Sequence, residues 1–209
     1  MLKVWGRKNS INVQKVLWCC DELGVAFERV DAGGAFGVVD DPAYRDLNPN
    51  GVVPTIEDGG FVLWESNTIV RYLAARYGAG GLWPDDPVTR ADGDRWMDWQ
   101  QTVLLAPMTT IFWGLIRTPP ESRDMAKIAA AAKKAHEAFA MLDKALTGRA
   151  FVTGDRFTMG DIPVGAMAFR WLNLDVEDAP RPSLPALEAW YARLLERPAY
   201  RTWVAQPMT

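Results

Sequence analysis

The sequence contains only two cysteines and one histidine among its 209 residues. Cys19 and Cys20 are adjacent within a helical pattern, where successive side chains point about 100° apart. A disulfide between them would therefore be strained, and the absence of a C-x-x-C pair excludes a thioredoxin-type dithiol. His136 lies in an alanine-rich run without a cysteine cluster, so we expect a helix-surface or interface residue and no metal site.

Long apolar runs and a strong excess of one charge are also missing. No stretch approaches the roughly 18 apolar residues of a membrane span, and the first residues are typical of a strand, with no signal-peptide core. The net charge of −3, without any dense run of lysine and arginine, disfavours a nucleic-acid partner. We therefore expect a cytoplasmic globular protein that binds neither membranes nor nucleic acid.

Residues 1–78 alternate between strand and helix patterns. Apolar periodicity and turn residues predict helices at 13–23 and 65–77, a helical turn at 42–47, and strands at 2–5, 27–30, 54–57 and 61–63. The last two strands form a hairpin across Asp58, Gly59 and Gly60. The order β-α-β followed by β-β-α predicts a compact α/β layer with a right-handed crossover.

Residues 79–87 are rich in glycine, proline and aspartate, which is typical of a linker. Beyond them the strand pattern disappears, and helical periodicity covers 88–116, 123–146, 159–173 and 184–196. Residues 88–209 are therefore predicted to form an all-α domain. Within it, Thr158 can cap a helix whose Asp161 reaches back to a backbone N–H, which assigns the segment 157–161 a folding role.

Two short segments of the first part together suggest a site for a peptide-like ligand. Val53-Pro54 follows turn residues and precedes an apolar strand, where proline favours a cis bond and removes a ladder donor. The neighbouring backbone N–H and C=O groups would be free to pair with an extended ligand. Glu65-Ser66 opens a helix, and a helix N-terminus attracts a carboxylate. A turn followed by an N-cap, with no ligand, is the alternative interpretation.

In this order, residues 48–54, 65–69 and 157–161, together with the β-α-β/β-β-α unit, resemble the soluble glutathione S-transferase superfamily, in its bacterial and theta- or nu-like forms. The resemblance covers the whole length. It implies a thioredoxin-like domain followed by an all-α helical bundle. It also implies a homodimer, a role in detoxification, and glutathione as the co-substrate.

The resemblance further implies roles for individual residues. The Val53 backbone would pair with the cysteinyl part of glutathione, and Pro54 would be the cis proline. Glu65 would bind the γ-glutamyl ammonium group and Ser66 its carboxylate, a division that fits the positive potential of a helix start. Residues 32–40 contain no basic side chain, so the glycyl carboxylate has no assigned partner.

The group that activates the thiol is expected just before the first helix. No tyrosine precedes Tyr44, and Ser10 occupies the place of the catalytic serine or cysteine in several bacterial and theta-like classes. Asn12 is the competing candidate, since some disulfide-reducing relatives use a Thr/Asn pair here. Either residue could instead only cap the helix.

The electrophile's pocket is expected between the segment after the first strand and the first long helix of the second domain. Its predicted lining is Arg7, Met108, Thr109, Phe112 and Trp113, with Trp171 as a further candidate. Arg7, Lys8 and Arg117 indicate tolerance for anionic co-substrates.

The leading hypothesis is an enzyme that stabilises the glutathione thiolate and directs it at a small electrophile. Two alternatives stay open: a glutathione-dependent disulfide or peroxide reductase, and a non-catalytic binding or stress-response protein of the same fold.

Overall fold

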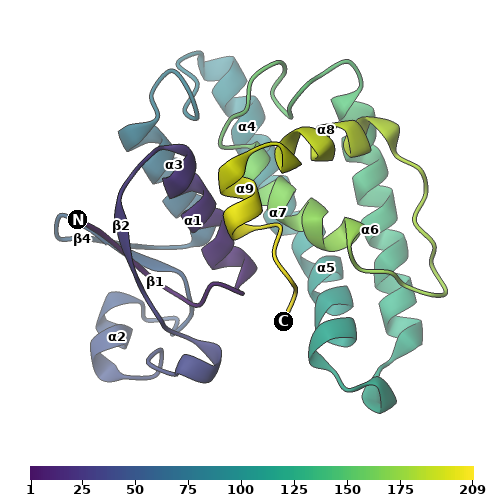
Figure 1. Ribbon diagram of the computed structural model, residues 1–209, viewed down its shortest axis with the longest axis horizontal. Coiled ribbons are helices and arrows are strands. Elements are labelled where there is room, and N and C mark those ends of the chain that lie inside the picture. The colour runs from purple at the N-terminus through teal and green to yellow at the C-terminus, as the bar shows by residue number, and fades with distance from the viewer.

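The computed structural model describes residues 1–209, and its first part is a four-stranded sheet covered by helices (Figure 1). The strands are β1 (Leu2–Trp5), β2 (Phe27–Val30), β3 (Thr55–Asp58) and β4 (Phe61–Trp64), in the order β2-β1-β3-β4. β1 and β2 are parallel, and the other two pairs are antiparallel. The predicted β-α-β and β-β-α units are therefore joined in one mixed sheet.

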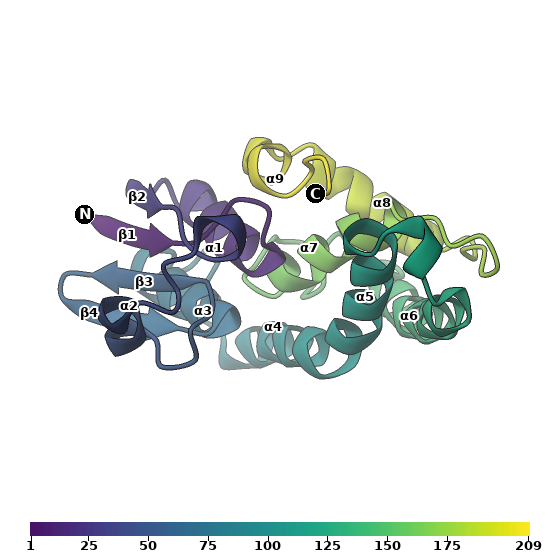
Figure 2. The ribbon, with the colours of Figure 1, turned by 90° about the horizontal axis from the view of Figure 1, so that it is seen from below.

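The helices of this part are α1 (Ile11–Glu22), α2 (Pro42–Leu47) and α3 (Ser66–Tyr77), with a short 3₁₀ turn, η1 (Gly34–Phe36). Figure 2 shows α1 and α3 between the sheet and the helices of the second part. Both helices bury apolar side chains on more than one side, because each one packs on the sheet and also on the helical part.

The second part is entirely helical from α4 onward. Its elements are α4 (Pro87–Trp99), η2 (Gln100–Leu104), α5 (Leu105–Phe112), η3 (Trp113–Arg117), η4 (Pro120–Ser122), α6 (Met125–Leu146), α7 (Asp161–Leu172), α8 (Pro185–Leu195) and α9 (Pro198–Trp203). A thioredoxin-like layer followed by a helical bundle is the predicted fold class. None of these helices is both long enough and apolar enough to cross a membrane.

The helix predicted over 88–116 is in fact interrupted by two π-helical turns, η2 and η3. Pro107 lies in the middle of this stretch. Its nitrogen cannot donate to the carbonyl of Val103, and its ring crowds that carbonyl, so the preceding turn widens. A wider turn of this kind is frequent near functional sites.

Asp161 is completely buried at the start of α7. One of its oxygens accepts the Thr158 backbone N–H at 3.0 Å, as predicted, while the other accepts the Val152 N–H and the Trp190 indole N–H. The Thr158 hydroxyl instead bonds Thr153. Burial raises the pKa of Asp161 to about 6 against these hydrogen bonds. The Asp161 carboxyl group therefore joins the start of α7 to the loop at Val152 and to Trp190 on α8.

The two parts share one continuous hydrophobic core. The ring of Trp18 on α1 packs against Tyr200 on α9, with centroids 4.7 Å apart, and against Phe157 at 5.5 Å. Gly165 on α7 faces the same ring, and a Cβ atom there would come within 3.1 Å of it. Helix α1 therefore belongs to the core of both domains.

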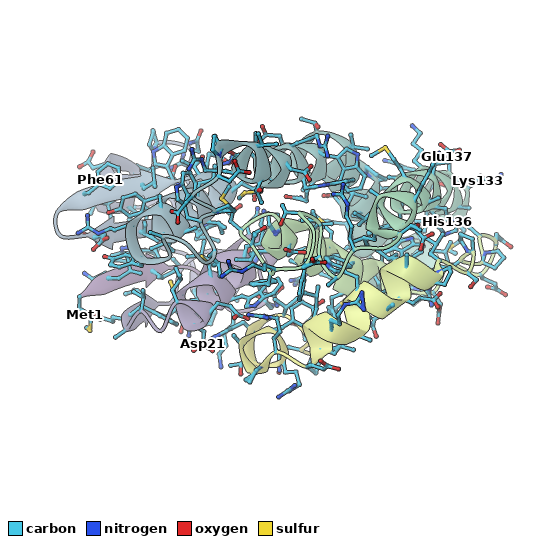
Figure 3. The ribbon with its side chains drawn as sticks, turned by 90° about the horizontal axis from the view of Figure 1, so that it is seen from above. Met1, Asp21, Phe61, Lys133, His136 and Glu137 are labelled. Carbon is cyan, nitrogen blue, oxygen red and sulfur yellow. The ribbon has the colours of Figure 1, made fainter.

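Figure 3 shows Phe61 and His136 near opposite ends of the molecule. His136 on α6 is half-buried, and its ring meets the edge of Trp171 at 5.7 Å. Burial, and then the charge of Arg181, lower the pKa of His136. The only histidine of the chain thus packs in the helical part, away from the sheet.

Candidate active site

The loop before β3 leaves one residue with its backbone unpaired. The Val53–Pro54 peptide bond is cis, as predicted, and neither the N–H nor the C=O of Val53 makes a hydrogen bond within the protein. The adjacent Val52 carbonyl accepts from the Tyr44 hydroxyl at 2.7 Å and from the Asn48 side chain at 2.9 Å. Tyr44 and Asn48 therefore fix the loop at Val52, while the Val53 backbone remains able to pair with an extended ligand.

Glu65 has an unusual backbone at the start of α3. Its φ is 71°, in the left-handed region that non-glycine residues avoid, at a cost of about 1–3 kcal/mol. Its side chain is exposed and caps no helix N–H. The first turn of α3 contains no acidic residue, so its free N–H groups keep their positive potential beside the Glu65 carboxylate.

Ser10 is the N-cap residue of α1, yet its hydroxyl caps nothing. Its carbonyl accepts from the Gln14 N–H at 2.9 Å, which begins the helix, while the hydroxyl has no partner within the protein. Gly6 lets the preceding loop approach α1, because a Cβ atom there would lie only 2.4 Å from a methyl carbon of Val13. The hydroxyl of a half-buried serine is therefore left available at a helix start.

The sheet brings these segments together. Trp5 pairs with Thr55, and Thr55 pairs with Trp64. The residues that follow β1, precede β3 and follow β4 therefore meet at the same end of the sheet. There the Ser66 hydroxyl donates to the Asn12 side-chain oxygen at 3.4 Å, which joins the first turns of α3 and α1. The predicted thiol-activating and peptide-binding residues thus occupy one continuous region.

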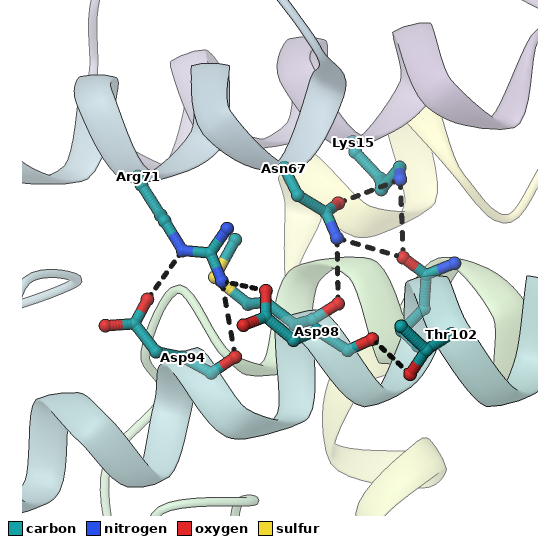
Figure 4. A network of polar contacts seen from close by, with 8 residues as sticks. Lys15, Asn67, Arg71, Asp94, Asp98 and Thr102 are labelled. Atoms are coloured by element: carbon teal, nitrogen blue, oxygen red, sulfur yellow. Dashed lines mark hydrogen bonds and ion pairs between the residues drawn. The ribbon is translucent and has the colours of Figure 1, made fainter.

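A polar network lies behind this region, buried at Lys15, Asn67 and Gln100, and the sequence reasoning missed it (Figure 4). The Lys15 amine donates to Asn67 at 2.9 Å and to Gln100 at 3.5 Å. The Asn67 amide donates to the Met97 carbonyl at 2.9 Å. Arg71, one turn further along α3, pairs with Asp94 at 2.6 Å and with Asp98. These contacts join α1 and α3 to α4 and η2.

Lys15 is completely buried without an ion pair in contact. Burial lowers its pKa to about 7; the charge of Glu65 works against this shift, and that of Arg170 adds to it. A lysine directly before the apolar run Val16-Leu17-Trp18 was the available sequence signal. Its partners lie 52 and 85 residues away, so no local pattern identifies them.

The residues predicted to line the electrophile's pocket fall into different environments. Met108 is 1% exposed and belongs to the core, whereas Trp113 is 59% exposed and Thr109 is also exposed. Phe112 is buried, and the guanidinium of Arg170 lies 3.8 Å from its ring centre. Trp171 instead stacks on Phe139 in the helical core.

Two cavities flank the start of α1. A cavity of about 10 Å³ is lined by Asn9, Gln14, Phe112, Phe169 and Arg170 and by residues 206–209. Asn9 donates to the Thr209 hydroxyl at 2.9 Å, so the last residues lie over this space. A second cavity, of about 520 Å³, opens between the β1–α1 loop and α9, and its basic lining residues are Arg7, Lys8 and Arg29.

A thioredoxin-like layer followed by a helical bundle, with the Val53 backbone unpaired and the Ser10 hydroxyl free, defines a class of proteins that can bind an extended, peptide-like ligand. Comparison with known proteins agrees. Residues 6–81 match the family described as the glutathione S-transferase N-terminal domain, and residues 125–193 match the C-terminal domain. The chain belongs to the glutathione S-transferase family.

Individual relatives cover the chain completely. Glutathione S-transferase GstB of Escherichia coli strain K12 is 43% identical over 211 residues, which span the whole of both chains. The theta class glutathione S-transferase of Xanthomonas axonopodis pv. citri, solved with glutathione bound, superposes with a TM-score of 0.94 at 52% identity, covering 100% of this chain and 99% of that one. Its apo form gives a TM-score of 0.86 at 46% identity, covering 100% and 98%.

Proposed function

We propose that this protein is a glutathione transferase that stabilises the glutathione thiolate and directs it at a carbon atom of a small electrophile. The observation that carries the proposal is the unpaired Val53 backbone, which lies at the same end of the sheet as the free Ser10 hydroxyl and the start of α3. Each of these groups can meet a different part of one tripeptide.

In this proposal the cysteinyl unit of glutathione pairs with the Val53 N–H and C=O. The γ-glutamyl carboxylate accepts from the Ser66 region, where the N–H groups of α3 are free. Its ammonium group meets the exposed Glu65 carboxylate, which the left-handed backbone presents beside the helix start. The strained conformation of Glu65 is supporting evidence, because such outliers cluster at ligand sites.

Ser10 is proposed to donate a hydrogen bond to the thiolate. A free thiol has a pKa near 8.5, and lowering it by about two units takes roughly 2.7 kcal/mol. A hydrogen bond to a charged sulfur supplies about 1.5–3 kcal/mol, and the α1 N-terminus adds about 0.3–1 kcal/mol. These two sources are sufficient. The Asn12 amide is the second candidate donor, because its oxygen already accepts from Ser66.

The reaction then needs no cysteine of the protein. The thiol proton leaves to solvent, the sulfur forms a bond to the electrophilic carbon, and the leaving group departs with the electron pair of its bond to carbon. Cys19 and Cys20 are both buried, and burial raises the pKa of each thiol. We therefore assign them to packing.

The proposal is tested by measuring glutathione-dependent turnover of 1-chloro-2,4-dinitrobenzene and, separately, of a small mixed disulfide. Turnover of the chloroarene is the expected result. Turnover of the disulfide alone would support the reductase instead. Turnover of neither, with no heat of glutathione binding by calorimetry, would support a non-catalytic protein.

We further propose a cytoplasmic homodimer with a role in detoxification. Phe61 and Trp64 support an interface, since both remain 37–49% exposed on β4, the edge strand of the sheet. Two unpaired cysteines support a reducing compartment. Light scattering would give the mass of a dimer, and a monomer at micromolar concentration would contradict this part of the proposal.

A further inference from the structure

Arg170 on α7 is a buried cation without a partner. Its side chain belongs to a residue only 9% exposed, and it makes no hydrogen bond or ion pair within the protein. Its guanidinium carbon lies 3.8 Å from the centre of the Phe112 ring. The guanidinium nitrogens keep some contact with solvent, but a largely buried charge without an ion pair is costly, so an anion that reached this position would be stabilised.

Other arginines between the helices are paired. Arg71 meets Asp94 at 2.6 Å, and Arg197 meets Glu22 at 2.5 Å. Both of those ion pairs are partly buried. Arg170 therefore differs from these two arginines.

Two further cations lie near Arg170, and no aspartate or glutamate pairs with it. Arg117, at the end of η3, places its guanidinium carbon 5.8 Å from the centre of the Phe112 ring, and it has no ion pair. Arg7 makes only a 3.5 Å hydrogen bond to Asn9. Burial, followed by the charges of Arg117 and Arg7, lowers the pKa of Arg170 to about 9. The three arginines therefore form a region of uncompensated positive charge.

This cluster lies beside the proposed thiol position. Arg170 and Phe112 line the same small cavity as Asn9 and Gln14, which flank Ser10 and the first turn of α1. The cavity, at about 10 Å³, holds no more than about one water molecule. Residues 206–209 cover it, so a substrate that reaches Arg170 must displace this last segment.

We propose that the electrophile carries a carboxylate, which Arg170 and Arg117 bind so that the adjacent carbon faces the thiolate near Ser10. The inference rests on the proposed transferase function and deepens it by naming the substrate class. A guanidinium matches a carboxylate with two parallel hydrogen bonds, and the Phe112 ring holds Arg170 in place by a cation–π contact. For an α-halocarboxylate, the sulfur–carbon bond forms, the carbon–halogen bond breaks, and halide leaves with the bonding electrons.

Iodoacetate and iodoacetamide provide a matched test, because they share the reacting carbon and the leaving group and differ in charge. For each, kcat/KM with glutathione is divided by the rate constant of the uncatalysed reaction. We expect this normalised value to be at least about tenfold higher for iodoacetate, as one charged hydrogen-bonded contact implies. Arg170→Gln and Arg117→Gln should each lower the ratio of the two values by about tenfold.

Arg117 is exposed, so Arg117→Gln keeps the test valid if the buried Arg170→Gln variant fails to fold. Arg156→Gln removes an exposed arginine from the loop before α7 and should leave the ratio unchanged. A wild-type ratio near one, or an unchanged ratio in folded Arg170→Gln and Arg117→Gln, would overturn the inference.

A second reading of the cluster is that it binds the glycyl carboxylate of glutathione. In that case the two variants would raise the KM for glutathione equally with both electrophiles and leave the ratio constant, which would also overturn the inference. Failure of the transferase proposal is distinguishable, because neither iodoacetamide nor 1-chloro-2,4-dinitrobenzene would then be accelerated. Acceleration of these neutral electrophiles without a preference for iodoacetate would reject the carboxylate site alone.

Discussion

The amine of Lys15 on α1 donates a hydrogen bond to the side-chain oxygen of Asn67 on α3 over 2.9 Å, although both residues are buried where the two domains meet. Asn67 directly follows Ser66, the residue proposed to bind the γ-glutamyl carboxylate. The lysine therefore holds the start of α3, where the proposed glutathione site lies, from the side of α1.

The first prediction concerns the pH dependence of stability. Burial lowers the pKa of Lys15 to about 7 in the folded protein, whereas an unfolded lysine titrates near about 10.4. Between these values the unfolded chain binds more protons, so this lysine makes stability rise with pH, by up to about 1.4 kcal/mol per pH unit. Below the folded pKa the full cost of the buried charge is present.

Urea unfolding of the wild type and Lys15→Met between about pH 7 and 9 measures this contribution. The stability of the wild type relative to the variant should increase across the range. Lys133→Met, which removes an exposed lysine from α6, should give a constant difference. A constant difference for Lys15→Met as well would show that Lys15 is fully charged in the folded state.

The second prediction separates the two candidate thiol donors. Ser10→Ala should raise the pKa of bound glutathione by about one to two units, because one hydrogen bond to the charged sulfur is lost. Affinity for glutathione should change little. The ultraviolet absorbance of the thiolate, followed through a pH titration of the complex, gives this pKa directly.

Asn12→Ala is the matched comparison. It also removes the acceptor of the Ser66 hydroxyl, so it should weaken glutathione binding more than it changes the thiol pKa. A large pKa change in Asn12→Ala, with none in Ser10→Ala, would transfer the activating role to Asn12.

The third prediction divides the role of Glu65 into charge and conformation. Glu65→Gln should weaken glutathione binding by about tenfold or more, since the ammonium group loses its charged partner, and stability should be nearly unchanged. Glu65→Gly should weaken binding too, but it should stabilise the fold by about 1 kcal/mol, because glycine adopts the left-handed backbone without strain.

Calorimetric titration with glutathione and urea unfolding measure the two effects. Glu121→Gln, at an exposed position in η4, is the control and should behave as the wild type. Normal glutathione affinity in Glu65→Gln would reject the assignment of the ammonium site.

The fourth prediction concerns the contact between Trp18 and Gly165. A Cβ atom at position 165 would lie 2.8 Å from a methyl carbon of Leu194 and 3.1 Å from the Trp18 ring. Gly165→Ala should therefore destabilise the protein by about 1–3 kcal/mol through overpacking. Thermal unfolding should show part of this loss recovered when the smaller phenylalanine replaces Trp18 in the double variant. Strict additivity would indicate that the two residues do not interact.

The sequence was sufficient for features that depend on neighbours along the chain. The cis proline, the hairpin at Asp58–Gly60 and the hydrogen bond from Thr158 to Asp161 all follow from short local patterns. The start of α3 at Ser66 was also predicted within one residue.

The remaining features depend on residues that meet only in three dimensions. No pattern within α1 shows that Lys15 contacts Gln100, and no pattern within α7 shows that Arg170 faces Phe112. Helix α9, from Pro198 to Trp203, is too short to display apolar periodicity. Pro107 was visible in the sequence, but the widened turn it accompanies required the backbone geometry.

The fit of Trp18 against Gly165 also constrains how such a protein can be recombined. A chimera that joins residues 1–78 of this chain to the helical half of a relative inherits a large indole on one side of the junction. It must also inherit a residue without a Cβ atom at the matching place on the other side. Positions 18 and 165 must therefore be exchanged together. In a library of chimeras that exchange whole domains, only those with this steric match would fold, and only their activities could then be compared.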